Sequence, residues 1–146
     1  QGLIYGFEEL GLQVKMGTSS KGYKNNDDCF LATTTADLHL AGQKLVGSAQ
    51  LRRGDSVLQH GSIILNQPDS LMAELLGAPK AVSGQRHAQL FEELGREILT
   101  RDLESVFTRG FEKAFACVFE TVPLLEDELK KARTLKKRFI VENLVG

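Results

Sequence analysis

The stretch GQKLVGSAQLRRGDSVLQHGSIIL, residues 42–65, predicts a pair of antiparallel strands, because two β-prone runs flank the dipeptide Gly54-Asp55. A two-residue turn at this dipeptide pairs Arg53 with Ser56 and sets Ala49 opposite His60. A second two-residue turn, at Gly42-Gln43, would pair Ala41 with Lys44 and add the preceding strand. We therefore expect an antiparallel sheet around this stretch.

Alternation along these strands divides their side chains between two faces. The mainly apolar face collects Leu38, Leu40, Leu45, Gly47, Ala49, Leu51, Leu58 and Ile64, with His60 and Ser62 as polar exceptions. The opposite face collects Asp37, His39, Lys44, Val46, Ser48, Gln50, Gln59 and Gly61. Such a polar surface is either solvated or a binding site. The small residues Gly47 and Ala49 favour a site, because they weaken a strand unless a ligand or another backbone lies close.

The rest of the chain supplies mainly helical patterns. Leu3, Phe7 and Leu10 recur at helical spacing and predict a helix that ends at Gly11. A short strand at 12–16, a polar loop at 17–28 and a β-prone run from Cys29 follow. From about residue 68 the pattern is helical, with one long helical stretch over 87–120 and a break at Pro123. These helices are expected to cover one face of the sheet.

Composition narrows the function classes. The net charge is −1 and 25% of the residues are charged, so the overall electrostatic field of the chain does not favour binding to nucleic acid or to an acidic membrane surface. No run approaches the roughly 18–20 apolar residues of a membrane helix, and no signal peptide is recognisable, so a cytoplasmic location is the expectation. No metal-ligand spacing and no phosphate-binding glycine loop is present.

Two residues are candidates for catalysis. Cys29 follows a polar loop, whereas a structural cysteine normally lies in an apolar stripe, and a nearby cation would favour its reactive thiolate. Lys44 could be that cation, although a lysine after a turn usually only keeps a strand edge soluble. Cys117 lies among apolar residues and is expected to pack in the core. His60 is expected to be structural, with a base role as the minor alternative, because the register places it on the face opposite Lys44.

Residues 29–65, CFLATTTADLHLAGQKLVGSAQLRRGDSVLQHGSIIL, resemble the lipoate-protein ligase and octanoyltransferase superfamily, whose catalytic domain also underlies biotin protein ligases. The shared features are a lysine strand ending in Gly-Ser-Ala-Gln, then Gln-His-Gly-Ser and an aliphatic run. The resemblance implies a mixed α/β (α+β) fold, with a central, largely antiparallel sheet and flanking helices. It is strong from Gln1 to about Leu65 and looser in the helical tail.

Within the superfamily, the Cys29-Phe30 pair before the lysine strand resembles the Cys/Lys octanoyltransferase branch. Residues 1–146 are then one partial catalytic domain, its C-terminal portion, with a helical tail from about residue 68. The family's N-terminal part, with its Arg-Arg and Gly-Gly segment, has no counterpart in these residues. A preceding segment or a second subunit would have to supply it.

The resemblance implies an octanoyltransferase of lipoate biosynthesis. Cys29 would take the octanoyl group from octanoyl-acyl carrier protein as a thioester, and a lysine of a lipoyl domain or of glycine-cleavage H protein would then accept it. Lys44 would stabilise the thiolate and the oxyanion. The implied substrate-binding residues are Asp37, Gly47, Ser48, Ala49, Gln50, Gln59, His60 and Gly61.

No ATP, metal or organic cofactor is implied for this branch, and neither nucleic acid nor a membrane is an expected partner. Two alternatives stay open. The first is an ATP-dependent lipoate-protein ligase, which would need ATP and magnesium, or a lipoyl amidotransferase. The second is a non-catalytic half of a split enzyme that binds the carrier protein.

Overall fold

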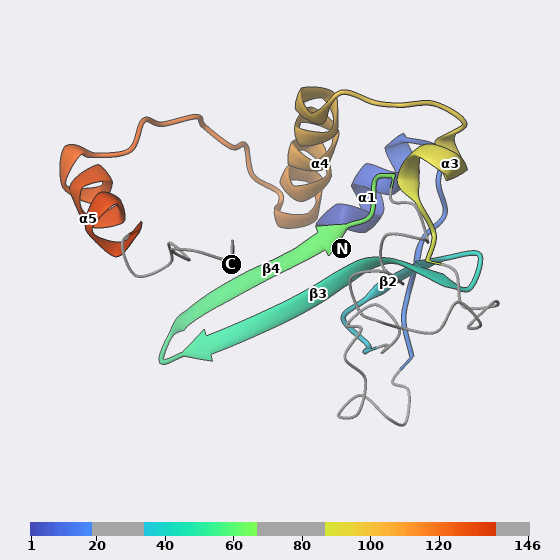
Figure 1. Ribbon diagram of the computed structural model, residues 1–146, viewed down its shortest axis with the longest axis horizontal. Helices are drawn as coiled ribbons and strands as arrows, with labels where there is room; N and C mark the ends of the chain where they lie inside the picture. Colours follow the sequence, from blue (N-terminus) through green and yellow to red (C-terminus); the bar gives the residue numbers. More distant parts are fainter. Residues whose placement is uncertain (19–33, 67–86, 137–146) are drawn as a thin grey trace, which may run out of the picture.

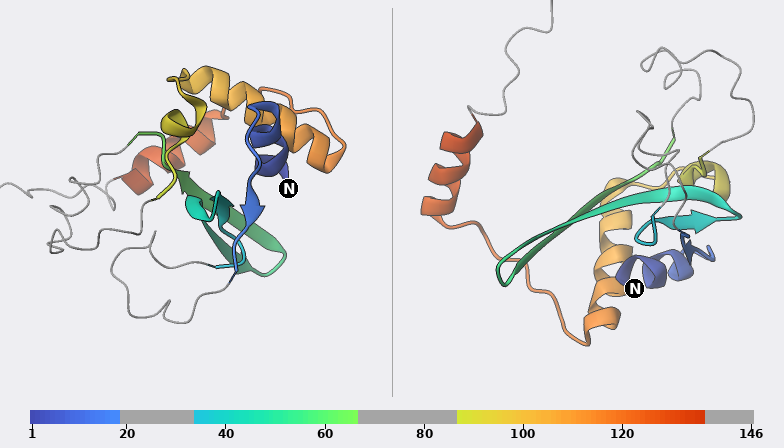
Figure 2. Two further views of the ribbon diagram at one scale, coloured as in Figure 1. Left: turned by 90° about the vertical axis from the view of Figure 1, so that its right-hand side faces the viewer. Right: turned by 90° about the horizontal axis from the view of Figure 1, so that it is seen from below.

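The computed structural model describes residues 1–18, 34–66 and 87–136 (Figure 1). Its elements are α1 (Gly2–Glu9), β1 (Lys15–Met16), β2 (Leu38–Leu40), β3 (Gln43–Arg53), β4 (Ser56–Ile63), α3 (Leu90–Leu94), α4 (Thr100–Phe115) and α5 (Glu126–Lys136). The strands form one antiparallel sheet in the order β1-β2-β3-β4. Helices α1 and α4 lie on the same side of that sheet (Figure 2). The predicted fold class is confirmed.

The β3–β4 hairpin has the predicted register. Arg53 pairs with Ser56 and Ala49 pairs with His60, and Gly54 takes a positive φ of 58° at the first position of the turn. The turn between β2 and β3 was predicted one residue too late. Leu40 pairs with Gln43, and the turn residues are Ala41 and Gly42, with φ angles of 49° and 85°. Alanine rarely adopts a positive φ, which is why the sequence pattern pointed to the wrong pair.

A register shift between Leu38 and His39 corrects the predicted faces. His39 lies opposite Lys44, but Leu38 lies opposite Val46, so Leu45 is an extra residue in β3. Such a bulge interrupts the alternation of side chains. Because Leu38 and His39 point to opposite faces, their partners Val46 and Lys44 do so as well. The prediction that Lys44 shares one face with Val46 is therefore wrong.

The hydrophobic core lies at the base of the hairpin, where β2 and β3 meet the helices. It comprises Phe7, Val14, Leu38, Leu40, Leu45, Val46, Ala88, Leu90 and Leu103. The outer half of the hairpin projects away from α1, α3 and α4 (Figure 1), and its residues Leu51 and Leu58 are 60% and 58% exposed. The hairpin thus has a buried base and an exposed outer half.

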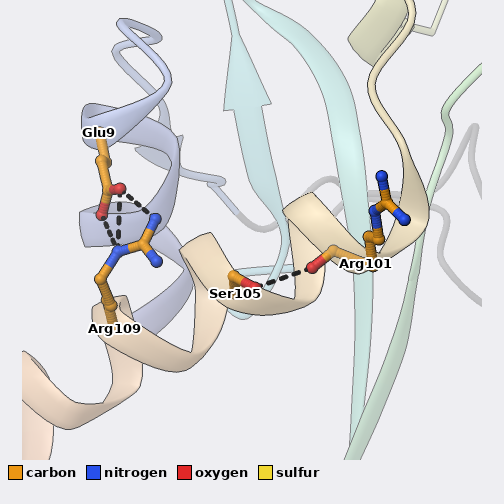
Figure 3. A network of polar contacts seen from close by, with 4 residues as sticks. All are labelled: Glu9, Arg101, Ser105 and Arg109. Atoms are coloured by element: carbon orange, nitrogen blue, oxygen red, sulfur yellow. Dashed lines mark hydrogen bonds and ion pairs between the residues drawn. The ribbon is translucent and has the colours of Figure 1, made fainter.

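Helices α1 and α4 cross at glycines. Gly110 of α4 packs directly on the α1 backbone: a Cβ at Gly110 would lie 2.7 Å from the nitrogen of Gly6 and would also collide with the carbonyl oxygen of Gly2. The Phe7 and Phe107 rings meet edge to face with centroids 5.0 Å apart. At the rim, Arg109 Nε donates to the two Glu9 oxygens at 3.0 and 3.2 Å (Figure 3).

The long helical stretch predicted over 87–120 is two helices. Gly95, with a φ of 65°, ends α3, and Ala116, with a φ of 52°, ends α4. The residues after Ala116 leave the helix: Cys117 is exposed, and Val118 is 88% exposed. The prediction that Cys117 packs in the core is wrong, because helical spacing no longer applies beyond the left-handed residue that ends α4.

Candidate functional site

The turn before β2 builds a fixed carboxylate at Asp37. The backbone N–H of Asp37 donates to the Thr34 carbonyl at 3.2 Å, and the Thr34 N–H donates to Asp37 Oδ2 at 2.6 Å. The Gly17 N–H donates to the Asp37 carbonyl at 2.8 Å, which ties this turn to the end of β1. Asp37 is 1% exposed. Its main chain and its side chain are therefore both held by neighbouring backbone.

Lys44, at the start of β3, is the buried partner of this carboxylate. Its Nζ lies 3.1 Å from Asp37 Oδ2, and the two side chains are 6% and 2% exposed. The Lys44 carbonyl accepts the Ala88 N–H at 3.1 Å, so the strand is also fixed by the segment before α3. A lysine that merely solubilises a strand edge keeps its ammonium in water. The burial of Lys44 does not fit that role.

The second carboxylate oxygen of Asp37 binds β3 further along. The Ser48 N–H donates to Asp37 Oδ1 at 2.9 Å. Burial by itself would raise the pKa of Asp37, but the N–H groups of Ser48 and Thr34 and the Lys44 ammonium together lower this pKa below its usual value. Asp37 is therefore a carboxylate at neutral pH. We call Asp37, Lys44 and the backbone N–H groups of Thr34 and Ser48 the Asp37 cluster.

Further along the hairpin, the predicted glutamines form an exposed ladder. Gln50 Nε2 donates to Gln59 Oε1 at 3.1 Å, and Arg52 Nε donates to Gln50 Oε1 at 2.9 Å. Sequence reasoning missed Arg52. Its position two residues after Gln50 could have revealed it, since such residues share a face of a strand.

The small residues of the hairpin bring its two backbones together. A Cβ at Gly61 would collide with the Gly47 carbonyl oxygen and lie 3.4 Å from the Ser48 Cα. The glycine at 61 is thus explained by strand packing. The predicted pairing places Ala49 opposite His60, and both are exposed in the outer half of the hairpin.

The structure changes the interpretation of two histidines, His60 and His39. The bulge at Leu45 interrupts the alternation that separated His60 from Lys44, so that argument for a purely structural His60 no longer holds. His39, for which the sequence suggested no role, is the direct cross-strand neighbour of Lys44. Its Nε2 is buried and has no hydrogen-bond partner within the described part of the chain.

Cys29 lies outside the described residues, so its approach to Lys44 stays a prediction. Within residues 1–18, 34–66 and 87–136, no group of three His, Cys, Asp or Glu residues could hold a metal ion. None of the described helices has the length and apolar character that a membrane crossing requires. A cavity of about 480 Å³ opens beside α3, between Asn66 and Glu97, and none of the predicted site residues lines it.

Comparison with known proteins identifies the family to which this chain is similar. Residues 1–112 match the model of the lipoyl protein ligase A/B catalytic domain. The octanoyltransferase LipM of Symbiobacterium thermophilum is 30% identical over 149 residues, covering 92% of this chain and 54% of that relative. The octanoyltransferase LipM of Moorella thermoacetica is 32% identical, with 94% and 54% covered.

The solved structures agree on the fold. A crystal structure of lipoate-protein ligase A bound with ATP superposes with a TM-score of 0.71 at 18% identity, covering 94% of this chain and 51% of that chain. At such low identity the similarity establishes the fold alone. The chain spans about half the length of the curated relatives that it matches.

Proposed function

Because the chain belongs to the lipoyl protein ligase A/B catalytic domain family, we propose that it is the part of an octanoyltransferase that carries the nucleophile and its cation. The donor is octanoyl-acyl carrier protein. The acceptor is a lysine of a lipoyl domain or of glycine-cleavage H protein. The observation that carries the proposal is the buried Lys44, fixed by Asp37, in a chain whose curated relatives are octanoyltransferases.

The chemistry runs in two steps. The Cys29 thiolate attacks the carbonyl carbon of the octanoyl thioester, a new S–C bond forms, and the carrier thiolate leaves. The neutral amine of the acceptor lysine then attacks the acyl-cysteine, the amide bond forms, the amine loses a proton to solvent water, and Cys29 leaves as the thiolate. Each step passes through an oxyanion, whose charge the Lys44 ammonium stabilises in a site largely closed to water.

The length of chain between the two groups is compatible with this role. Cys29 precedes Thr34 by five residues in the sequence, and Thr34 binds the same carboxylate as Lys44. Five residues span at most about 18 Å when fully extended. A reach of this size allows the thiol to approach Lys44, as the proposal requires.

Substrate recognition completes the proposal. We assign the octanoyl thioester to the hairpin around the Asp37 cluster, with Gly47, Ser48, Ala49, Gln50, Gln59, His60 and Gly61 as binding residues. Residues 1–146 act as one unit of the catalytic domain, with a helical tail from about residue 68. The remainder of the acyl pocket comes from a preceding segment or a second subunit, as expected for a chain that spans about half of its relatives. The reaction needs no cofactor and takes place in the cytoplasm.

Mass spectrometry of the protein after incubation with octanoyl-acyl carrier protein tests the thioester. We expect an octanoyl adduct on Cys29 that Cys29→Ser abolishes and that the acceptor domain removes. Cys117→Ser is the matched control, because Cys117 is exposed and should leave the adduct unchanged. Equal losses in the two variants would show that the wrong thiol was chosen.

Assays of lipoylation, acyl transfer and binding, run beside this experiment, separate the alternatives. Lipoylation that depends on ATP, without an adduct on Cys29, would identify a ligase. Transfer from a lipoylated protein instead of the acyl carrier protein would identify an amidotransferase. Binding of a lipoyl domain that survives both Cys29→Ala and Lys44→Ala, without turnover when the missing part is added, would identify a non-catalytic half.

A further inference from the structure

Strand β4 forms an edge of the sheet (Figure 1). The order β1-β2-β3-β4 leaves one side of β4 without a neighbouring strand within residues 1–18, 34–66 and 87–136. Its residues from Ser56 to Ser62 are all exposed. At the opposite edge, β1 has only two residues, so it offers little backbone to a further strand. The described sheet can therefore be extended mainly at β4.

The register shows which backbone groups of β4 face outward. The Ile64 N–H donates to the Leu45 carbonyl at 3.3 Å, directly beyond the last pair of the ladder. In an antiparallel ladder, pairs that exchange hydrogen bonds alternate with pairs that do not. Every second residue of β4 therefore binds β3 through its N–H and C=O groups, and the residues between them direct these groups away from β3. Among the exposed residues, the outward ones are Val57, Gln59 and Gly61.

The sequence of β4 carries none of the features that usually protect a long edge. Soluble proteins protect such an edge with a proline, a lysine or another charged side chain, or a β-bulge. The strand SVLQHGSI contains no Pro, Lys, Arg, Asp or Glu, and its eight pairs with β3 run without a register shift. Leu51 and Leu58 lie directly opposite each other and are 60% and 58% exposed. Outward backbone groups beside apolar side chains are suited to the addition of another strand.

The length of the relatives indicates which polypeptide supplies that strand. The match includes 92% of this chain but only 54% of the octanoyltransferase from Symbiobacterium thermophilum. The edge also lies close to the Asp37 cluster, because Gly61 pairs with Ser48, whose N–H binds Asp37. Neighbouring strands are about 5 Å apart, so a strand added to β4 would run about 10 Å from the backbone of Ser48.

We propose that β4 receives an extended strand from the half of the family's polypeptide that this chain does not span. The added strand binds the outward N–H and C=O groups of Val57, Gln59 and Gly61, and it places apolar side chains beside Leu58. It thereby brings the other half to the Asp37 cluster, where the remainder of the acyl pocket is needed. The identity of this partner rests on the proposed function.

Co-expression with the other half tests the docking. The probe is the part of the Symbiobacterium thermophilum octanoyltransferase LipM outside its match to this chain, produced as a separate polypeptide beside the tagged full chain. Hydrogen exchange with mass spectrometry then compares the peptide 56–63 in the complex and in the chain alone. We expect its exchange to slow about tenfold or more in the complex, because the outward N–H groups gain partners. The peptide 100–115 is the internal control and should change much less.

Two substitutions at Val57 separate backbone pairing from the loss of an apolar side chain. Val57→Pro removes an outward N–H and no bond to β3, and a proline is tolerated on the open side of an edge strand. It should lower the amount of co-purified probe about tenfold or more. Val57→Thr keeps the N–H and the branched shape, so it should retain nearly all of the probe. Unchanged exchange of residues 43–53 in Val57→Pro will show that the hairpin still forms.

Absence of a complex would overturn the inference, and so would a complex in which the peptide 56–63 exchanges as fast as in the chain alone. Equal recovery of the probe with the two Val57 variants would also overturn it. Slow exchange of this peptide in the chain alone, with the mass of a dimer in size-exclusion chromatography, would assign the edge to a second copy and overturn the proposed partner. If Val57→Pro does not fold, the comparison in the parent protein decides.

Octanoyl transfer by the complex is measured separately. A protected β4 without octanoyl transfer would refute the proposed function and leave the docking of the strand supported. Octanoyl transfer by a complex in which β4 stays exposed would refute the docking and leave the proposed function supported.

Discussion

Removing the Lys44 charge, the Asp37 charge, or both should reveal how strongly the buried pair is coupled. Lys44→Met leaves Asp37 with two backbone N–H donors, so we expect a cost of about 3 kcal/mol in the free energy of unfolding, the lower end for a broken buried pair. Asp37→Asn removes the carboxylate that pairs with Lys44 and leaves one oxygen for several donors, so we expect a cost of about 4 kcal/mol.

The double variant carries neither charge of the pair. Independent effects would sum to about 7 kcal/mol, but we expect a cost of about 4 to 5 kcal/mol, which is a coupling of about 2 to 3 kcal/mol. Urea unfolding at neutral pH measures all four proteins, provided that the denaturant slope stays constant. The exposed pair Arg109–Glu9 is the matched control and should show much weaker coupling, because water and salt screen it.

Additive costs in the Asp37–Lys44 cycle, within about 0.5 kcal/mol, would show that the ion pair does not form in solution. The reasoning about the site would then be refuted at its first step. Strong coupling with full octanoyl transfer by Lys44→Met would separate the two conclusions differently: the pair would be real, and Lys44 would not stabilise the oxyanion.

Three further predictions concern stability. Gly110→Ala should destabilise the protein by about 1 to 3 kcal/mol in spite of alanine's better helix propensity, since the new Cβ meets the α1 backbone. The control Thr108→Ala, at an exposed position of the same helix, should stabilise the protein by about 0.5 kcal/mol. Thermal unfolding that ranks the two variants the other way would contradict the close crossing of α1 and α4. Gly61→Ala should push β4 away from the Gly47 carbonyl and lower the melting temperature, and an unchanged melting temperature would mean that the strands are further apart in solution. Because the pKa of Asp37 is lowered from its ordinary value of 3.8, its ionisation stabilises the fold above pH 3.8, and this stabilisation is lost as the pH falls through the lower folded-state pKa. The free energy of acid unfolding should therefore depend less on pH in Asp37→Asn. Parallel curves for the two proteins would count against a buried anion.

Side-chain pattern was sufficient to predict the hairpin. Gly54 between two β-prone runs fixes the turn, and the register of eight residue pairs from Val46–Ile63 to Arg53–Ser56 follows from it. The earlier turn was misplaced because Ala41 takes a positive φ that glycine normally provides. The bulge at Leu45 could not be predicted from the sequence, since a leucine is equally suitable in a regular strand and in a bulged one.

The candidate site was predicted only in part for a similar reason. The sequence pointed to Lys44 and Asp37 as residues of one polar surface, but it could not show that both are buried and paired, because burial depends on what the rest of the chain packs against them. The hydrogen bonds from Gly17, Thr34 and Ser48 are made by backbone, which any residue type could supply. Backbone contacts of this kind are invisible to motif reading.

The outer half of the β3–β4 hairpin has a practical consequence for producing the protein. Leu51, Val57 and Leu58 are each more than half exposed there, at 60%, 55% and 58%. A two-stranded ribbon with exposed aliphatic side chains tends to stack on other copies and to aggregate. We expect these 146 residues, expressed alone, to be poorly soluble. The substitution Leu58→Lys, far along the hairpin from Lys44, should place a charge in this apolar patch and keep the chain monodisperse without disturbing its chemistry.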